Sequence, residues 1–117
     1  MRERIKDKGR LEHILAAIER AERFSAGMSL DELRQDELTY FAVVKCIEIV
    51  GEASYMLTAE FREAHPQTIW RDIIAMRHVL VHGYYQVSAK QVWKVVNEDL
   101  PTLKEQVALY YSEFRED

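Results

Sequence analysis

Apolar side chains near the carboxyl end of the chain recur at alternating intervals of 3 and 4 residues. They are Trp93, Val96, Leu100, Leu103, Val107, Tyr110 and Phe114. This spacing places all of them on one face of an α-helix, and other parts of the protein must cover that face. Pro101 interrupts the run without shifting its phase, so we expect a kink there and no change of direction. Ser88 and Gln91 form a capping-box pattern that marks the beginning of this helix.

Two earlier segments also have helical periodicity. In residues 11–24, apolar and charged residues alternate at the intervals of an amphipathic helix. Ser29 and Glu32 then form a second capping box, which predicts a short helical connector. Residues 37–63 are apolar almost all the way round, so we expect one long helix there that is covered on most sides.

A fourth helix is predicted after His65 and Pro66, because a residue that precedes proline avoids the helical conformation. Thr68 is placed to cap this helix, which should cover residues 69–82 and stop at Gly83. The 117 residues include only 4 Gly and 2 Pro, too few for the many turns of a β-sandwich or barrel. We therefore predict an all-α fold: an antiparallel up-and-down bundle of about four long helices, in a single domain over residues 1–117.

Charge and cysteine content limit what such a protein binds and where it works. The formal net charge is −4 and the pI is near 5.6, which argues against a broadly basic surface for nucleic acid. Any phosphate-binding site must therefore be local. We expect neither a signal peptide nor a membrane span, because no apolar stretch is long enough. The lone Cys46 has apolar neighbours, as expected of a buried thiol in a cytoplasmic protein.

Charged side chains interrupt two of the apolar helices. Lys45, Glu48 and Glu52 fall within a sector of roughly 60° on the helix of residues 37–63. This stripe is either a solvent edge or the place where carboxylates face an internal cation. Arg77 lies within the apolar arc of the next helix, where burial of a guanidinium is unfavourable unless anionic groups meet it. Glu48 and Glu52 are candidate partners, and a phosphate bound bidentately is the alternative.

His78 and His82 lie four residues apart on the opposite, polar face of this helix, which they share with Arg71. A metal site, an ordinary pair of surface histidines, and a general acid–base at His82 are the three interpretations. No further His or Cys stands at a ligand-like spacing, so we expect no metal and no cofactor. Arg77 and His82 are about 140° apart on an ideal helix. They converge only if the helix unwinds before Gly83 or if two copies meet across a two-fold interface.

The segment Arg77–Tyr84 has the pattern R-x4-H-x-Y, and on this pattern the chain resembles the HepT-type proteins of the HEPN superfamily. The resemblance covers about residues 10–110. It includes Ile47–Ala53, Trp70–Met76, Val92-Trp93 and Asp99-Leu100-Pro101. Such proteins are the toxin half of a type VII-like prokaryotic toxin–antitoxin pair whose other half is a minimal nucleotidyltransferase. His78 departs from the family pattern, in which Asn or Asp often follows the arginine, so its role stays open.

The resemblance implies a homodimer in which two R-x4-H motifs share a cleft and cut RNA as a metal-independent endoribonuclease. His82 would then transfer a proton, as base or acid, and Arg77 would stabilise the charge on the phosphate. His78, Glu48 and Glu52 are possible auxiliary residues. DNA is not expected as a substrate, and no membrane partner is expected.

Tyr84 has two interpretations. A tyrosine just past a helix end usually covers the edge of a core with its hydroxyl in water. In the resembling family, the tyrosine of H-x-Y accepts AMP from the partner nucleotidyltransferase (AMPylation), which silences the toxin. AMP beside Arg77 would bring negative charge to the cleft and block RNA.

Two other functions are compatible with these residues. A non-catalytic subunit that presents substrate to a nucleotidyltransferase, or docks with it, would use Arg77 for phosphate or for Glu48 and Glu52, and would not need His82. The acidic pI favours this alternative mildly, whereas the R-x4-H-x-Y pattern favours the nuclease. A purely structural dimer would leave the arginine in the apolar arc without a functional explanation.

Overall fold

The computed structural model describes the backbone of residues 2–82 and 88–114 and the side chains of residues 6–82 and 88–114. All regular secondary structure in these ranges is helical, which confirms the predicted all-α class. The elements are α1 (Arg2–Phe24), α2 (Leu30–Gln35), α3 (Glu37–Met56), α4 (Ala59–Ala64), α5 (Trp70–His82), α6 (Ala89–Lys94), the π-helical turn η2 (Val95–Asp99) and α7 (Leu100–Ser112). No helix in this described part of the chain is both long enough and apolar enough to cross a membrane.

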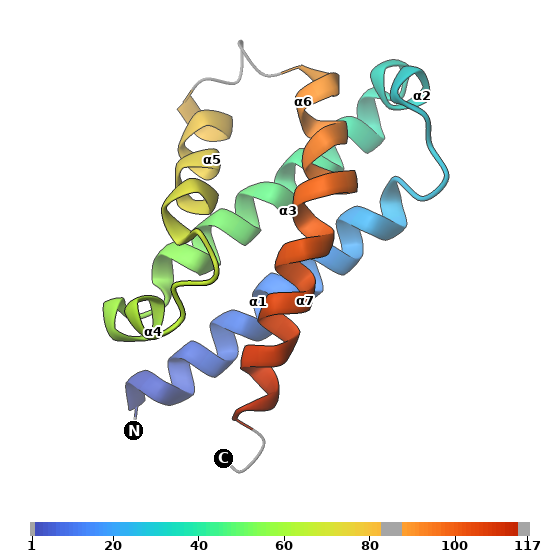
Figure 1. The fold of residues 1–117 in the computed structure, drawn as a ribbon. Helices are drawn as coiled ribbons and strands as arrows, with labels where there is room; N and C mark the ends of the chain where they lie inside the picture. The colour runs from blue at the N-terminus through green and yellow to red at the C-terminus, as the bar shows by residue number, and fades with distance from the viewer. Residues whose placement is uncertain (1, 83–87, 115–117) are drawn as a thin grey trace.

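The long helical segments alternate in direction, as Figure 1 shows. In this view α1 and α5 run upward, and α3 and the consecutive α6, η2 and α7 run downward. α3 packs against both α1 and α5, whereas α7 packs against α1. α5 therefore lies at one edge of the bundle, with α3 as its main neighbour.

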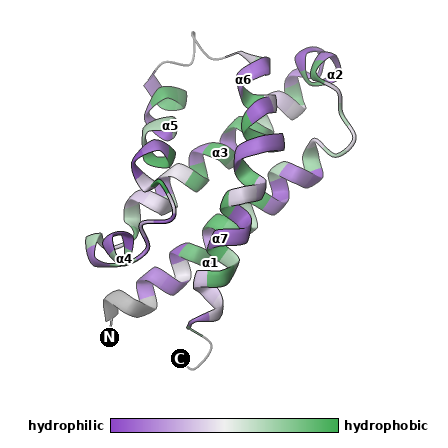
Figure 2. Ribbon diagram, in the orientation of Figure 1, coloured by the Kyte–Doolittle hydropathy of each residue, from purple (hydrophilic) through white to green (hydrophobic). Residues whose placement is uncertain are grey.

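The interior is built from the apolar positions that the periodicity picks out. In Figure 2, hydrophobic residues concentrate on the central turns of α3 and α7, and hydrophilic residues mark the outer turns of α1. Three long helices contribute fully buried residues to this core: α1 contributes Leu11, α3 Val50 and α7 Val107. Cys46 is also buried, as expected, and burial raises the pKa of its thiol. This places it among the structural residues.

α1 begins about two turns earlier than the expected start at Leu11. The extra turns are fixed by Asp7, which is 4% exposed and accepts hydrogen bonds from both the backbone N–H and the hydroxyl of Thr58, at 2.9 and 2.8 Å. The periodicity could not predict this extension, because residues 2–10 have no regular apolar repeat and Thr58 is 51 residues away.

The prediction of one long helix over residues 37–63 is wrong for the second part of this segment, since α3 ends at Met56 and α4 begins at Ala59. Leu57 and Thr58 are extended, and the Thr58 hydroxyl accepts the N–H of Phe61 as the N-cap of α4. Apolar residues continue on both sides of this break, so the hydrophobic pattern did not reveal it.

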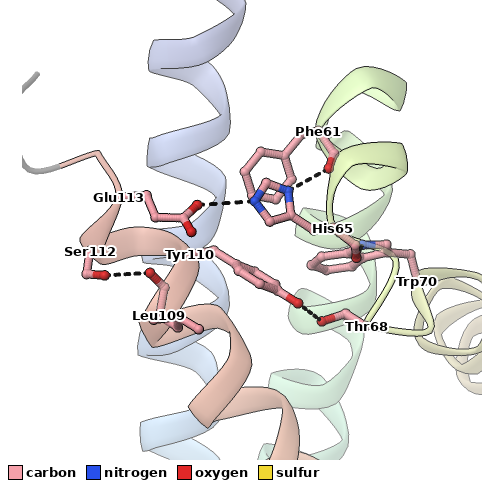
Figure 3. Close-up of polar contacts among 8 residues, drawn as sticks. All are labelled: Phe61, His65, Thr68, Trp70, Leu109, Tyr110, Ser112 and Glu113. Atoms are coloured by element: carbon pink, nitrogen blue, oxygen red, sulfur yellow. Dashed lines mark hydrogen bonds and ion pairs between the residues drawn. The ribbon is translucent and has the colours of Figure 1, made fainter.

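The segment between α4 and α5 is anchored on the end of α7, as Figure 3 shows. The ring of His65 lies between Phe61 and Tyr110, with centroid distances of 4.1 and 4.4 Å. Its Nδ1 is 2.8 Å from the carbonyl oxygen of Phe61, and its Nε2 is 3.2 Å from the Glu113 carboxylate. The carbonyl of His65 in turn accepts the indole N–H of Trp70, the first residue of α5. These contacts fix where α5 begins.

Thr68 does not cap α5 as predicted. Its hydroxyl is 2.6 Å from the hydroxyl of Tyr110 and donates to the side-chain oxygen of Gln106 at 2.7 Å. The Thr68 hydroxyl thus bonds to residues of α7. α5 begins at Trp70, whose backbone N–H donates to the carbonyl of Thr68. The helix itself nevertheless covers almost the predicted residues.

The two capping boxes are confirmed, at Ser29 with Glu32 and at Ser88 with Gln91. The predicted final helix is present but is not α-helical throughout, since the π-helical turn η2 separates α6 from α7. Pro101 stands in the first turn of α7, directly after this turn. A π-helical turn is one way for a helix to accommodate a proline, which has no N–H to donate.

Candidate active site

α5 approaches α3 closely at Gly51. A Cβ atom at this position would collide with the Cβ of Arg77 and would lie 3.2 Å from the carbonyl oxygen of Ile73. The absent side chain therefore lets the two helix backbones come together at Arg77. This contact determines how far the arginine stands from the polar stripe of α3.

The guanidinium of Arg77 pairs with Glu52 on that stripe. Its Nε atom is 2.5 Å from Oε2 of Glu52, and the two side chains are 34% and 50% exposed. Arg77 is thus partly buried on the face of α5 that packs against α3, and one of its two expected carboxylate partners meets it. Glu48 lies on the same stripe, where its carboxylate is 3.9 Å from Nζ of Lys45.

Arg77 also lines a hollow of about 290 Å³ between α1, α3 and α5. The polar stripe of α3 forms one wall, so this stripe is neither an open edge nor fully buried. The lining residues are Arg10, His13, Lys45, Glu48, Ile49, Glu52, Ala53, Met56, Arg77 and Val81. Both charged and apolar groups thus surround the arginine.

His82 lies elsewhere. It is the last residue of α5, is exposed, and does not line the hollow beside Arg77. Its ring centroid is 4.7 Å from that of His78, which is exposed as well. Because α5 is helical through His82, the first of the two alternatives, in which the helix unwinds before Gly83, does not hold for the described residues. Within one copy of the chain, the structure therefore does not bring Arg77 and His82 together in one hollow.

Two predictions concern residues outside the described part of the chain. Gly83 and Tyr84 lie there, so the expectations about the helix stop and about Tyr84 stay predictions. Among the described residues, no three His, Cys, Asp or Glu side chains lie close enough together to hold a metal ion.

Arg10 and His13 are site residues that sequence reasoning missed. Both belong to the polar part of α1 and both line the hollow beside Arg77. Their spacing of three residues places them near each other on the helix surface. Nothing in the sequence shows that α3 and α5 border this side of α1, so the spacing alone carries no signal of a site.

Comparison with known proteins adds to this geometry. The model of a family described as "Ribonuclease HepT-like" matches residues 14–109. "Probable ribonuclease HepT" of Thermococcus cleftensis is 40% identical over 97 residues, which are 83% of this chain and 88% of that protein. "Putative RNase TTE0752" of Caldanaerobacter subterraneus is 36% identical over 97 residues, 83% of this chain and 87% of that protein. No solved structure gives a significant match.

The fold and the site define a small helical-bundle protein with a charged hollow at the crossing of α3 and α5. The family match covers most of the chain and includes Gly51, Arg77 and His82. The chain therefore belongs to the HepT-like ribonuclease family.

Proposed function

We propose that this protein is the toxin of a toxin–antitoxin pair and acts as a metal-independent endoribonuclease. The observation that carries the proposal is the partly buried Arg77, paired with Glu52 and open to a hollow, on the helix that ends at His82. These are the R and H of the R-x4-H motif in a chain that belongs to the HepT-like ribonuclease family.

The chemistry of RNA cleavage fits these two side chains. The 2′-oxygen attacks phosphorus while the bond from phosphorus to the 5′-oxygen breaks, so one proton leaves the 2′-hydroxyl and one is added to the 5′-oxygen. An imidazole at His82 serves for one transfer, and the His82 of a second copy or His78 serves for the other. Arg77 stabilises the negative charge that builds on the phosphate in the transition state.

A homodimer is part of the proposal, because Arg77 and His82 face different directions on α5. α5 exposes an apolar side chain on each side of the motif: Val79, 49% exposed, next to His78, and Val81, 37% exposed, at the hollow beside Arg77. A second copy packed on α5 about a two-fold axis would cover them and bring two motifs to one cleft. The position of α5 at the edge of the bundle supports this arrangement.

Silencing is proposed to take place at Tyr84, by transfer of AMP from a cognate minimal nucleotidyltransferase. Mass spectrometry of the toxin co-expressed with this partner should find AMP on Tyr84. Modification of Tyr85 alone, or no modification, would contradict this part of the proposal.

The catalytic roles are tested by inducible expression of the wild type and of His82→Ala and Arg77→Ala, with growth and RNA integrity measured together. General acid–base help contributes roughly 10²–10⁴-fold, so His82→Ala should lose nearly all RNA cleavage while it keeps its helical circular dichroism. Arg71→Ala is the matched control for Arg77→Ala, since Arg71 lies on the same helix with a side chain that is 91% exposed. Cleavage by a well-folded His82→Ala protein at the wild-type rate would refute the role of His82, and loss of cleavage in EDTA would refute the metal-independent mechanism.

A non-catalytic docking subunit of a nucleotidyltransferase is the second candidate. The ion pair between Arg77 and Glu52 favours it, because an arginine that already has a carboxylate partner has a structural explanation. The same expression experiment separates the two functions. A docking subunit does not need His82, so growth and RNA integrity should be the same for His82→Ala as for the wild type.

A further inference from the structure

The hollow beside Arg77 contains two basic residues that the proposed catalysis does not use. Arg10 and His13 stand on α1, on the side of the hollow contributed by that helix. Lys45 and Arg77 each have a carboxylate within ion-pair distance, at Glu48 and Glu52. Among the described residues, by contrast, neither Arg10 nor His13 has a hydrogen-bond or ion-pair partner, so their nitrogen atoms are available to a ligand.

The charges that line the hollow favour an anion. Three permanent cations, Arg10, Lys45 and Arg77, face two carboxylates, Glu48 and Glu52. The lining is therefore positive by one charge, and by two when His13 is protonated, in a chain whose net charge is −4. This is the kind of local site that an acidic protein needs if it is to bind a phosphate.

The size and the apolar part of the hollow favour one nucleotide-sized group. Its volume of about 290 Å³ is at the lower limit of small-ligand sites, roughly 300 Å³, and is too small for a helix of a partner protein, which is about 10 Å wide. Ile49, Met56 and Val81 supply apolar surface beside the charged groups. A phosphate with its attached ribose matches this combination, since proteins bind single strands through basic grooves that follow the backbone.

We propose that Arg10 and His13 bind a phosphodiester group of the RNA substrate next to the one held by Arg77. This inference rests on the proposed ribonuclease function and extends it, because it assigns a substrate-binding subsite to α1. The guanidinium of Arg10 takes two phosphate oxygens bidentately, and the imidazole of His13 donates a further hydrogen bond. α1 thereby positions the strand, and the chemistry stays with α5.

RNA binding is measured in the His82→Ala background, so that cleavage does not interfere. Fluorescence anisotropy with a labelled single-stranded 2′-O-methyl oligouridylate, which has no 2′-hydroxyl to attack, gives the Kd at several KCl concentrations for this protein and for the added changes Arg10→Gln, Arg10→Lys and His13→Gln. Arg34→Gln is the matched control, since Arg34 is an exposed arginine on α2, at the other end of α1 from Arg10. Circular dichroism of each variant checks that it is folded.

Arg10→Gln should weaken binding about fivefold, the size expected for one solvent-accessible charge contact. It should also lower the slope of log Kd against log salt by roughly 0.7, the value for one phosphate contact on a single strand. Arg10→Lys should keep the slope, and Arg34→Gln should match the background. The subsite is refuted if Arg10→Gln and His13→Gln both bind like Arg34→Gln.

The outcome separates this inference from the ribonuclease proposal. If His82→Ala still cuts RNA but Arg10→Gln weakens binding, the subsite stands and the catalytic role of His82 falls. If His82→Ala is inactive and both Arg10→Gln and His13→Gln bind like the control, the catalytic role stands and the subsite falls. Absence of any RNA binding by the protein would refute the subsite.

Discussion

Arg77 and Glu52 form an ion pair in which both side chains remain in contact with water. Pairs of this kind contribute about 1 kcal/mol or less to the free energy of unfolding, because solvent screens the charges. A leucine at position 77 would contribute roughly 1.5–3 kcal/mol if it were fully buried. Stability alone therefore does not favour arginine over leucine in the apolar arc of α5, and the proposed role in binding an anion supplies a further reason for it.

Asp36 is a residue whose contribution to stability should depend on pH. Its carboxylate caps α3 by accepting hydrogen bonds from the backbone N–H and the hydroxyl of Thr39, at 3.0 and 2.8 Å, and the backbone bond is the main reason that the pKa of Asp36 is lowered. A lowered pKa means that the folded protein is stabilised by this group at neutral pH and loses that stabilisation as the pH falls below 3.8. Asp36→Asn keeps an N-cap but has no carboxyl to titrate. The free energy of unfolding, measured with urea from pH 7 to pH 3, should therefore fall less steeply for Asp36→Asn than for the wild type. Equal pH profiles of the two proteins would contradict the role of Asp36.

Single residues of the site differ in how well the sequence predicts them. The helical wheel predicts a carboxylate partner for Arg77 because the stripe of α3 and the arc of α5 lie on consecutive long helices. It also predicts that Arg77 and His82 point in different directions, and α5 keeps them apart as a continuous helix. Arg10 and His13 could not be found this way, because their relation to Arg77 depends on how α1, α3 and α5 are arranged.

At the scale of elements, periodicity predicts where helices lie but misses breaks made by long-range hydrogen bonds. Thr58 ends the α3 pattern because Asp7 of α1 holds its backbone N–H and its hydroxyl. Thr68 is drawn to Tyr110 of α7 and so leaves the start of α5 without its cap. In both cases the partner is far away in the sequence, and no local pattern indicates it.

The crossing of α3 and α5 should be sensitive to one methyl group. Gly51→Ala places a Cβ against the Cβ of Arg77 and the Ile73 carbonyl, so we expect a loss of about 1–3 kcal/mol in the free energy of unfolding and a loss of RNA cleavage as Arg77 moves. Gly9→Ala is the matched control, because a Cβ at Gly9 has no neighbouring atom within 4 Å and alanine favours a helix. Urea unfolding of both variants measures the difference. A Gly51→Ala protein as stable as Gly9→Ala would show that the helices do not meet as closely as described.

At the scale of the whole molecule, the edge position of α5 gives the proposed dimer its clearest test. Val79 is an exposed apolar residue on α5, and Leu109 is another on α7. Val79→Lys should place a charge in the two-fold interface and give a monomer that no longer cleaves RNA, whereas Leu109→Lys should keep the mass of the dimer. Sedimentation equilibrium measures both masses. If Val79→Lys still has the mass of a dimer, or if only Leu109→Lys has the mass of a monomer, the dimer interface does not lie on α5.

The hydrogen bonds between Asp7 and Thr58 have a consequence for how the protein is made. A chain leaves the ribosome from its amino end, so residues 2–10 emerge well before the partner that holds them. These turns of α1 cannot acquire their final contact until synthesis has passed Thr58. Arg10 belongs to these turns, so the wall of the hollow that α1 contributes is completed only when α3 has been made and has turned back along α1.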